Sequence, residues 1–147
     1  MTKRTHLIWA LPLVGLTALL GVPLGASAAG PELEIELNKV EDSAQNSCVG
    51  AFVLRNHMGA TLDRFSLDLY VFDTNGIIAR QLVLDLAPLR ANKTTVVRFP
   101  LLDQACAAIG KVLVNDIPSC RSAATGEDLD CLAGLNVSSR DRIELTK

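Results

Sequence analysis

The sequence has few of the side chains with which proteins bind metals or catalyse reactions. It contains two histidines, two methionines and one tryptophan in 147 residues, and aromatic residues make up 4% of it. Catalytic triads and zinc sites combine a histidine or cysteine with further residues at typical spacings. No C-x-x-C pair, G-x-S-x-G nucleophile elbow, glycine-rich phosphate loop or EF-hand loop occurs. This scarcity disfavours metal, nucleotide and triad chemistry.

Positive charge is also scarce. The chain has 14 basic and 16 acidic residues and no basic cluster. Nucleic-acid binding needs a positive stripe that replaces the counterions of the phosphates. We therefore expect no nucleic-acid partner.

The first 28 residues have the organisation of an export signal. Lys3 and Arg4 are followed by no charged residue until Glu32, and 7–20 is strongly apolar. The sequence Ala26-Ser27-Ala28 is the small-x-small pattern that signal peptidase accepts.

We expect a signal peptide over 1–28, with cleavage after Ala28, and an exported protein that is periplasmic or secreted. The alternative is an uncleaved membrane anchor, since the uncharged run is long enough to span a bilayer. The residues Pro12, Gly15, Gly21 and Pro23 in that run, together with the cleavage pattern, argue against the anchor. The remaining residues, 29–147, are predicted to form one domain. Removing Lys3 and Arg4 leaves 12 basic and 16 acidic residues, a net charge of −4.

All four cysteines lie in the predicted mature chain, at Cys48, Cys106, Cys120 and Cys131. An even number of cysteines in an exported protein indicates structural disulfides, and four cysteines allow three pairings. We expect Cys48 to pair with Cys106 and Cys120 with Cys131. The second bridge would tie down a polar, glycine-containing loop at its base.

The most regularly patterned stretch is 64–86, which predicts a β-hairpin. Apolar residues at 65, 67, 69 and 71 alternate along its first arm, and the turn sequence Asp73-Thr74-Asn75-Gly76 follows. In the second arm, residues 78, 82, 84 and 86 are expected to share an apolar face that only Arg80 interrupts. Further strands are predicted at 33–38, 48–54, 94–99 and 111–115, with weaker candidates at 135–138 and 143–145. Only 103–109 favours a helix, with Asp103 as its N-cap. Pro118 is expected to end the strand predicted at 111–115.

About seven short strands with turn signals between them are typical of an immunoglobulin-like antiparallel β-sandwich. We therefore predict an all-β fold of this kind with one short helix. A small β-barrel is the main alternative.

The centre of the chain contains Asn56 before a loop, the strand sequence LDLYVFD at 67–73, and Asn75-Gly76. Leu86-Ala87-Pro88 and the strand that begins at Thr94 follow. In these features the chain resembles the small bacterial exported Ig-like domains of the FxLYD type. The resemblance implies an Ig-like fold and a location in the cell envelope. It implies no activity, because that family shares none.

Few residues are candidates for chemistry. His57 is the only histidine of the predicted mature chain, and Met58 beside it suggests half of a copper site. We interpret His57 instead as a loop residue exposed to water. Asp73 fits the first position of a type I turn, and Asp68 and Asp85 fit solvent-facing or edge-strand charges. We assign no catalytic, metal or cofactor-binding residue.

The functional hypothesis is a non-catalytic binding module, held together by two disulfides, that contacts an unknown envelope protein or glycan. The contacts would be made through an exposed edge strand or through the loops at 56–63 and 120–131. The alternative is a small periplasmic hydrolase or metal carrier that uses His57. The sequence leaves the oligomeric state open.

Overall fold

The computed structural model describes residues 32–147. The predicted signal peptide, 1–28, lies outside these residues, so both the signal and its cleavage remain predictions. Within the described part of the chain, no helix is long and apolar enough to cross a membrane.

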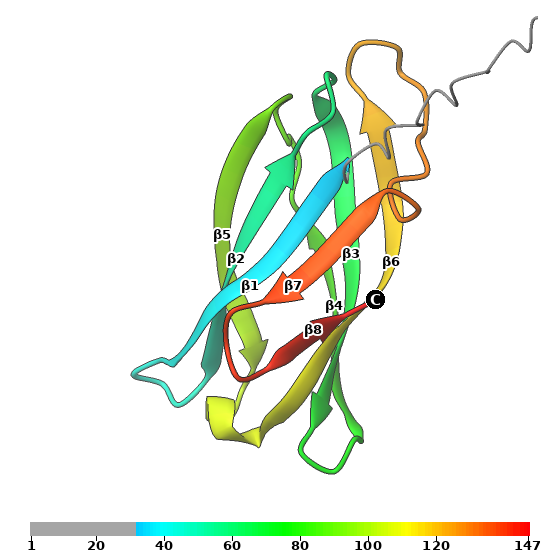
Figure 1. Ribbon diagram of the computed structural model, residues 1–147. Coiled ribbons are helices and arrows are strands. Elements are labelled where there is room, and N and C mark those ends of the chain that lie inside the picture. Colours follow the sequence, from blue (N-terminus) through cyan, green and yellow to red (C-terminus); the bar gives the residue numbers. More distant parts are fainter. Residues whose placement is uncertain (1–31) are drawn as a thin grey trace, which may run out of the picture.

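The chain forms two four-stranded sheets that pack face to face as an all-β sandwich (Figure 1). Sheet A has the strand order β5-β2-β1-β7, and its strands are β5 (Lys93–Leu102), β2 (Cys48–Asn56), β1 (Leu33–Asp42) and β7 (Leu135–Ser139). Sheet B has the order β4-β3-β6-β8, and its strands are β4 (Ile78–Asp85), β3 (Leu62–Asp73), β6 (Ile109–Ser122) and β8 (Glu144–Thr146). This architecture confirms the predicted Ig-like sandwich.

The core lies between the sheets and follows the period-two pattern of the strands. Residues 65, 67, 69 and 71 of β3 point inward, as predicted, and are at most 1% exposed. They pack with the inward residues of β1 and β2, among them Ile35, Leu37 and Phe52. Gly50 on β2 allows close approach here, because a Cβ at this position would lie 2.7 Å from the ring of Phe52.

The second arm of the hairpin follows the prediction only in part. Leu82 and Leu84 point toward the core and are half-buried, but Ile78 is 55% exposed. The register shifts between the pairs Val71–Arg80 and Phe72–Ile78, so one extra residue lies in β4. Such a bulge moves the following side chains to the other face of the sheet.

The sandwich is not purely antiparallel, which corrects the prediction. The weak strand candidates near the C-terminus form two separate strands in different sheets. Strand β7 pairs parallel with β1, and β8 pairs parallel with β6. At the corner between β7 and β8, the Ser139 hydroxyl is placed to donate a hydrogen bond to the carbonyls of Asp141 and Ile143.

The short helix predicted at 103–109 is present only as a single 3₁₀ turn, η1 (Cys106–Ala108), and the predicted side-chain cap is absent. The carboxylate of Asp42, and not that of Asp103, accepts the backbone N–H of Cys106 in this turn, at 2.6 Å. The segment is too short for an α-helix because β6 begins immediately afterwards, at Ile109.

Pro118 was expected to end a strand, but β6 continues through it to Ser122. Between the pairs Ser66–Ser119 and Asp68–Asp116, two residues of β6 face one residue of β3. Pro118 lies in this bulge, where the N–H that proline lacks is not needed by the ladder.

Both predicted disulfides are present. Cys48 pairs with Cys106 at a Cα–Cα distance of 4.6 Å, and Cys120 pairs with Cys131 at 6.2 Å. The first joins the start of β2 to η1, and the second joins the end of β6 to the segment before β7. Two buried disulfides favour an oxidising compartment.

Candidate functional site

His57 lies just after β2, and its side chain is 49% exposed. Its Nε2 is 3.3 Å from Oε1 of Glu34 on β1. The side chain of Met58, unlike that of His57, is partly buried and packs against the core. Among residues 32–147, no group of three or more His, Cys, Asp or Glu side chains is placed to hold a metal ion.

Asp73 is the turn residue that the sequence predicts. Its Oδ1 accepts the backbone N–H groups of Asn75 and Ile77, each at 2.8 Å. Both bonds lower the pKa of Asp73, and the bond from Ile77 has the larger effect. Gly76 completes the turn in the left-handed conformation, with φ of 80°. The role of Asp73 in the hairpin turn is therefore structural.

Asp68 is not the solvent-facing or edge charge that we expected. It lies on β3, an inner strand of sheet B, and is 8% exposed. Gln81 Nε2 donates to its Oδ1 at 2.7 Å, and Asn115 Nδ2 donates to its Oδ2 at 2.9 Å. Two amides therefore cover this carboxylate on the outer face of the sheet. Asp85, by contrast, is exposed at the end of the edge strand β4.

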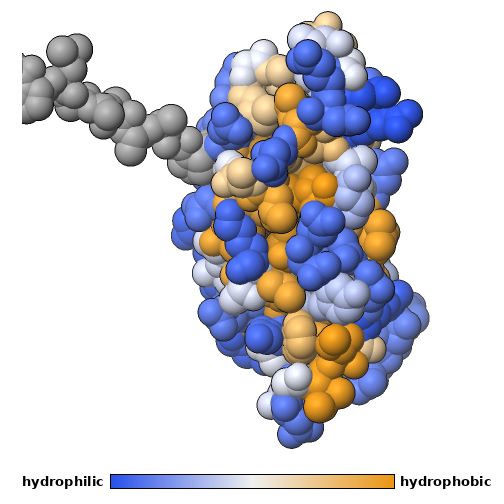
Figure 2. All heavy atoms as spheres, turned by 90° about the vertical axis from the view of Figure 1, so that its right-hand side faces the viewer, coloured by the Kyte–Doolittle hydropathy of each residue, from blue (hydrophilic) through white to orange (hydrophobic). Residues whose placement is uncertain are grey.

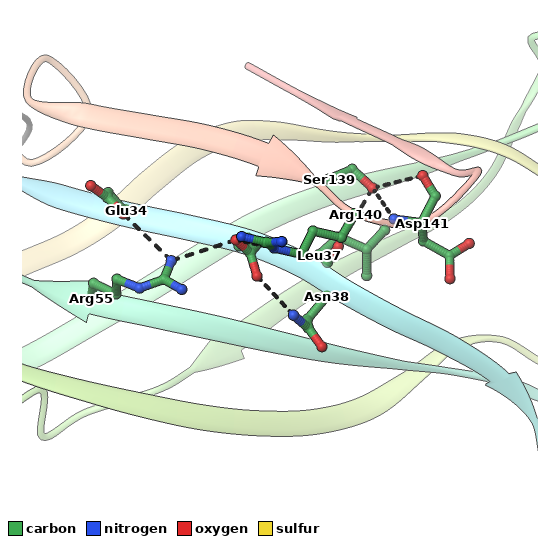
Figure 3. A network of polar contacts seen from close by, with 8 residues as sticks. Glu34, Leu37, Asn38, Arg55, Ser139, Arg140 and Asp141 are labelled. Atoms are coloured by element: carbon green, nitrogen blue, oxygen red, sulfur yellow. Dashed lines mark hydrogen bonds and ion pairs between the residues drawn. The ribbon is translucent and has the colours of Figure 1, made fainter.

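The outer face of sheet A carries a network of charged side chains (Figure 3). Arg55 on β2 reaches both Glu34 and Glu36 of β1, at 3.4 and 3.7 Å. Arg140, after β7, approaches Glu36 with its Nε at 3.0 Å. Asn38 donates to the same carboxylate at 2.8 Å. Glu36 is 5% exposed and forms the centre of the network.

The environment of Glu36 favours its charged form. The amide of Asn38, followed by the guanidinium groups of Arg140 and Arg55, lowers the pKa of Glu36, although burial opposes the shift. A lowered pKa in the folded state stabilises the protein above the ordinary value of 4.5. That contribution is lost as the pH falls below 4.5 toward the folded-state pKa.

We expect Glu36→Gln to lower the free energy of unfolding at pH 7 by about 1–2 kcal/mol, because bonds to a charged acceptor are lost. The difference from the unmodified protein should be smaller at pH 3 than at pH 7, because the stabilisation by the charged form of Glu36 decreases as the pH falls below 4.5. Urea unfolding at the two pH values measures this. Glu144→Gln, at an exposed position of β8, should change little, and an equal loss for both variants would contradict the assignment.

The loop at 56–63 is anchored by Asn56, which is 3% exposed. Its amide donates to the carbonyls of Ala60, Leu89 and Arg90, and its Oδ1 accepts the N–H of Met58 at 2.9 Å. Asn56 therefore ties this loop to the segment that follows β4. Its role is structural.

The loop expected at 120–131 begins later than predicted, because β6 includes residues up to Ser122. Arg121 forms a double hydrogen bond with Asp63, at 2.7 and 3.0 Å. This pair raises the pKa of Arg121 and lowers that of Asp63. The residues beyond are mostly exposed and polar.

The outer face of sheet B carries several large apolar side chains. Three of the four exposed large hydrophobic side chains among residues 32–147 belong to β4 and the turn before it. They are Ile77, Ile78 and Val83, which are 64, 55 and 64% exposed. The register places three half-buried residues on the same face as Ile78 and Val83, namely Tyr70, Phe72 and Leu113. The ammonium group of Lys111 lies over the Phe72 ring, 4.8 Å from its centroid.

A space-filling view also shows apolar residues at the surface (Figure 2). One group lies at the lower end, where Figure 1 places the turn between β3 and β4, and further apolar atoms lie along the middle of this view. Exposed apolar patches on soluble proteins mark interaction sites more often than scattered single residues do. We call the set Tyr70, Phe72, Ile78, Val83 and Leu113, which share the outer face of sheet B, the apolar face.

The chain is similar in fold to IrmA from Escherichia coli. The TM-score is 0.50 at 13% sequence identity, and the match covers 73% of this chain and 91% of IrmA. This similarity supports the β-sandwich and carries no function to the present chain. No protein-family model and no curated protein sequence matches it.

The apolar face was not predicted from the sequence. The signal was present, since Tyr70 and Phe72 alternate with the core residues of β3 and must lie on the opposite side. The sequence did not show that Ile78 and Val83 of β4 and Leu113 of β6 lie on the same outer face of sheet B.

Proposed function

We propose that this protein is an exported, non-catalytic interaction module that binds another protein of the cell envelope through the apolar face. The observation that carries the proposal is that exposed Ile78 and Val83 share one face with the aromatic residues Tyr70 and Phe72. Large apolar side chains at such positions add little to the core, and they are the kind that a protein interface buries.

The location is proposed on two grounds. The disulfides Cys48–Cys106 and Cys120–Cys131 form in oxidising compartments such as the periplasm. The sequence of the first 28 residues is organised as an export signal.

A protein is a better candidate than a glycan as the partner. Protein interfaces have a core that is enriched in aromatic residues and poor in charge. The apolar face shares the aromatic enrichment, because Tyr70 and Phe72 lie beside aliphatic residues from two other strands.

Capture from envelope extract tests the proposal. We expect the immobilised protein to retain a specific envelope protein, and Ile78→Lys to reduce the retained amount at least tenfold, because it places a charge in the contact. Val96→Lys is the matched control, since Val96 is 62% exposed on β5 of the other sheet. It should retain the same amount as the unmodified protein.

Three outcomes would overturn the proposal. They are capture of no specific protein, capture of a glycan in place of a protein, and equal losses for Ile78→Lys and Val96→Lys. An activity in a hydrolase screen that disappears in His57→Ala would favour the enzymatic alternative.

A further inference from the structure

The four edge strands of the sandwich differ in how they are protected from pairing with another strand. Strand β5 exposes Lys93, Arg98 and Pro100, and β7 and β8 have only five and three residues. Charged residues, proline and shortness are the features that discourage strand addition at a sheet edge. Strand β4 has eight residues without proline; its bulge and Arg80 lie in its first half, and 81–85 form a regular strand with one charged residue, Asp85. It is therefore the edge that is best able to accept another strand.

The hydrogen-bonding groups that β4 presents can be assigned from its register with β3. The Leu86 N–H donates to the Phe65 carbonyl at 2.8 Å, directly across the pair. Bonds in an antiparallel pair alternate, so residues 84 and 82 also bond to β3. The N–H and C=O groups of Gln81, Val83 and Asp85 therefore point away from the sheet.

The core is also incompletely covered along this side of the sandwich. The inward side chains of β4 and of the neighbouring edge strand β5 are only half-buried, and they are Leu82, Leu84, Val97 and Phe99. On the opposite side, the residues of the β7–β8 region close the core, with Leu135, Ile143 and Leu145 at most 4% exposed. A strand added beside β4 would cover Leu82 and Leu84.

We propose that β4 pairs with β4 of a second copy of this chain, antiparallel and with the two-fold axis at Val83. The sequence Gln81-Leu82-Val83-Leu84-Asp85 is symmetric in polarity about Val83. In this register Val83 lies opposite Val83 of the second copy, and Leu82 lies opposite Leu84 of the second copy. The two four-stranded sheets B become one continuous sheet.

The polar ends of the strand also complement each other in this register. Gln81 faces Asp85 of the second copy on the outer side. The Gln81 amide uses one N–H for Asp68, at 2.7 Å, and the second N–H remains for this contact. Asp85 accepts the N–H of Ala87 with Oδ1, at 3.2 Å, and Oδ2 remains for the Gln81 N–H. No like charges face each other directly, which would oppose pairing.

The dimer goes beyond the proposed function and needs no other partner to be tested. It would place two apolar faces on one continuous sheet, so that a partner with two matching sites could bind both. The contact is small, because it involves one short strand from each copy. Interfaces at the low end of the size range are weak, and we expect a dissociation constant on the order of 1–100 µM.

Sedimentation equilibrium of the protein purified from the exported fraction tests the dimer. The average mass should rise from one chain toward two as the concentration increases through the micromolar range. Val83→Lys should raise the dissociation constant at least tenfold, because it places two ammonium groups opposite each other at the axis. Val96→Lys, equally exposed on the other sheet, should self-associate like the unmodified protein.

A cross-link tests the register. Val83→Cys should form a disulfide-linked dimer with mild oxidant, because the axis brings position 83 within bonding distance of itself. Val96→Cys should not cross-link. A protein that stays monomeric at all concentrations, equal effects of the two lysine variants, or an unpaired Val83→Cys would each overturn the proposal. A monomer that loses capture of a foreign protein through Val83→Lys would assign β4 to that partner and also overturn it.

Discussion

Replacing Cys48 and Cys106 together by alanine should lower the free energy of unfolding by about 4 kcal/mol, as the chain-entropy model predicts for a long loop. The bridge joins cysteines that are 58 residues apart in sequence. It therefore restricts a large part of the unfolded chain. Urea unfolding of the exported protein measures the loss, and part of the protein should fail to accumulate.

The second disulfide provides the matched control. Cys120 and Cys131 are 11 residues apart, so the same model gives a smaller loss of about 3 kcal/mol for their double alanine variant. A larger loss from the second pair than from the first would show that loop closure does not determine how each bridge stabilises this protein.

Asn56→Ala should be the most destabilising single substitution of a polar residue. It removes three bonds from the amide to backbone carbonyls and one from Met58 N–H to Oδ1. Because Asn56 is 3% exposed, the loss leaves these groups poorly satisfied. We expect a cost of about 2–4 kcal/mol, which corresponds to a melting temperature lower by roughly 10 °C.

Thermal unfolding followed by circular dichroism measures this cost. Asn136→Ala is the control, since Asn136 is exposed on β7 and should change stability by less than about 0.5 kcal/mol. If Asn56→Ala melts together with this control, Asn56 does not hold the loop to the segment after β4.

Much of the fold could be predicted because local patterns determine it. The alternation along β3 places Phe65 and Leu69 in the core, and the turn chemistry of Asp73 and Gly76 reverses the chain at the expected position. The disulfide pairing also follows, since Cys120 and Cys131 enclose a polar loop. These features depend on neighbouring residues along the chain.

The remaining features depend on residues that are distant in sequence. Pro118 is compatible with a strand only because β6 bulges opposite β3. The division of the C-terminal segment between two sheets follows from pairing with β1 and β6. Asp68 is covered because Gln81 and Asn115 arrive from the two neighbouring strands. None of these arrangements has a local sequence signal.

The candidate site was hidden for the same reason. Its residues come from β3, β4 and β6, and each strand alone has an ordinary pattern. Sequence reasoning pointed to loops or an edge strand as contact regions. The loop at 56–63 is anchored to the domain by Asn56, whereas the edge strand β4 lies within the proposed surface.

Photo-cross-linking in living cells tests the proposed interaction most directly. A photoreactive amino acid is placed at Ile78 on the apolar face or at Val96 on sheet A, both of which are exposed. We predict that position 78 yields a discrete adduct with another envelope protein and that position 96 does not. No adduct from position 78, or the same adducts from both positions, would contradict the proposal that the apolar face binds a partner.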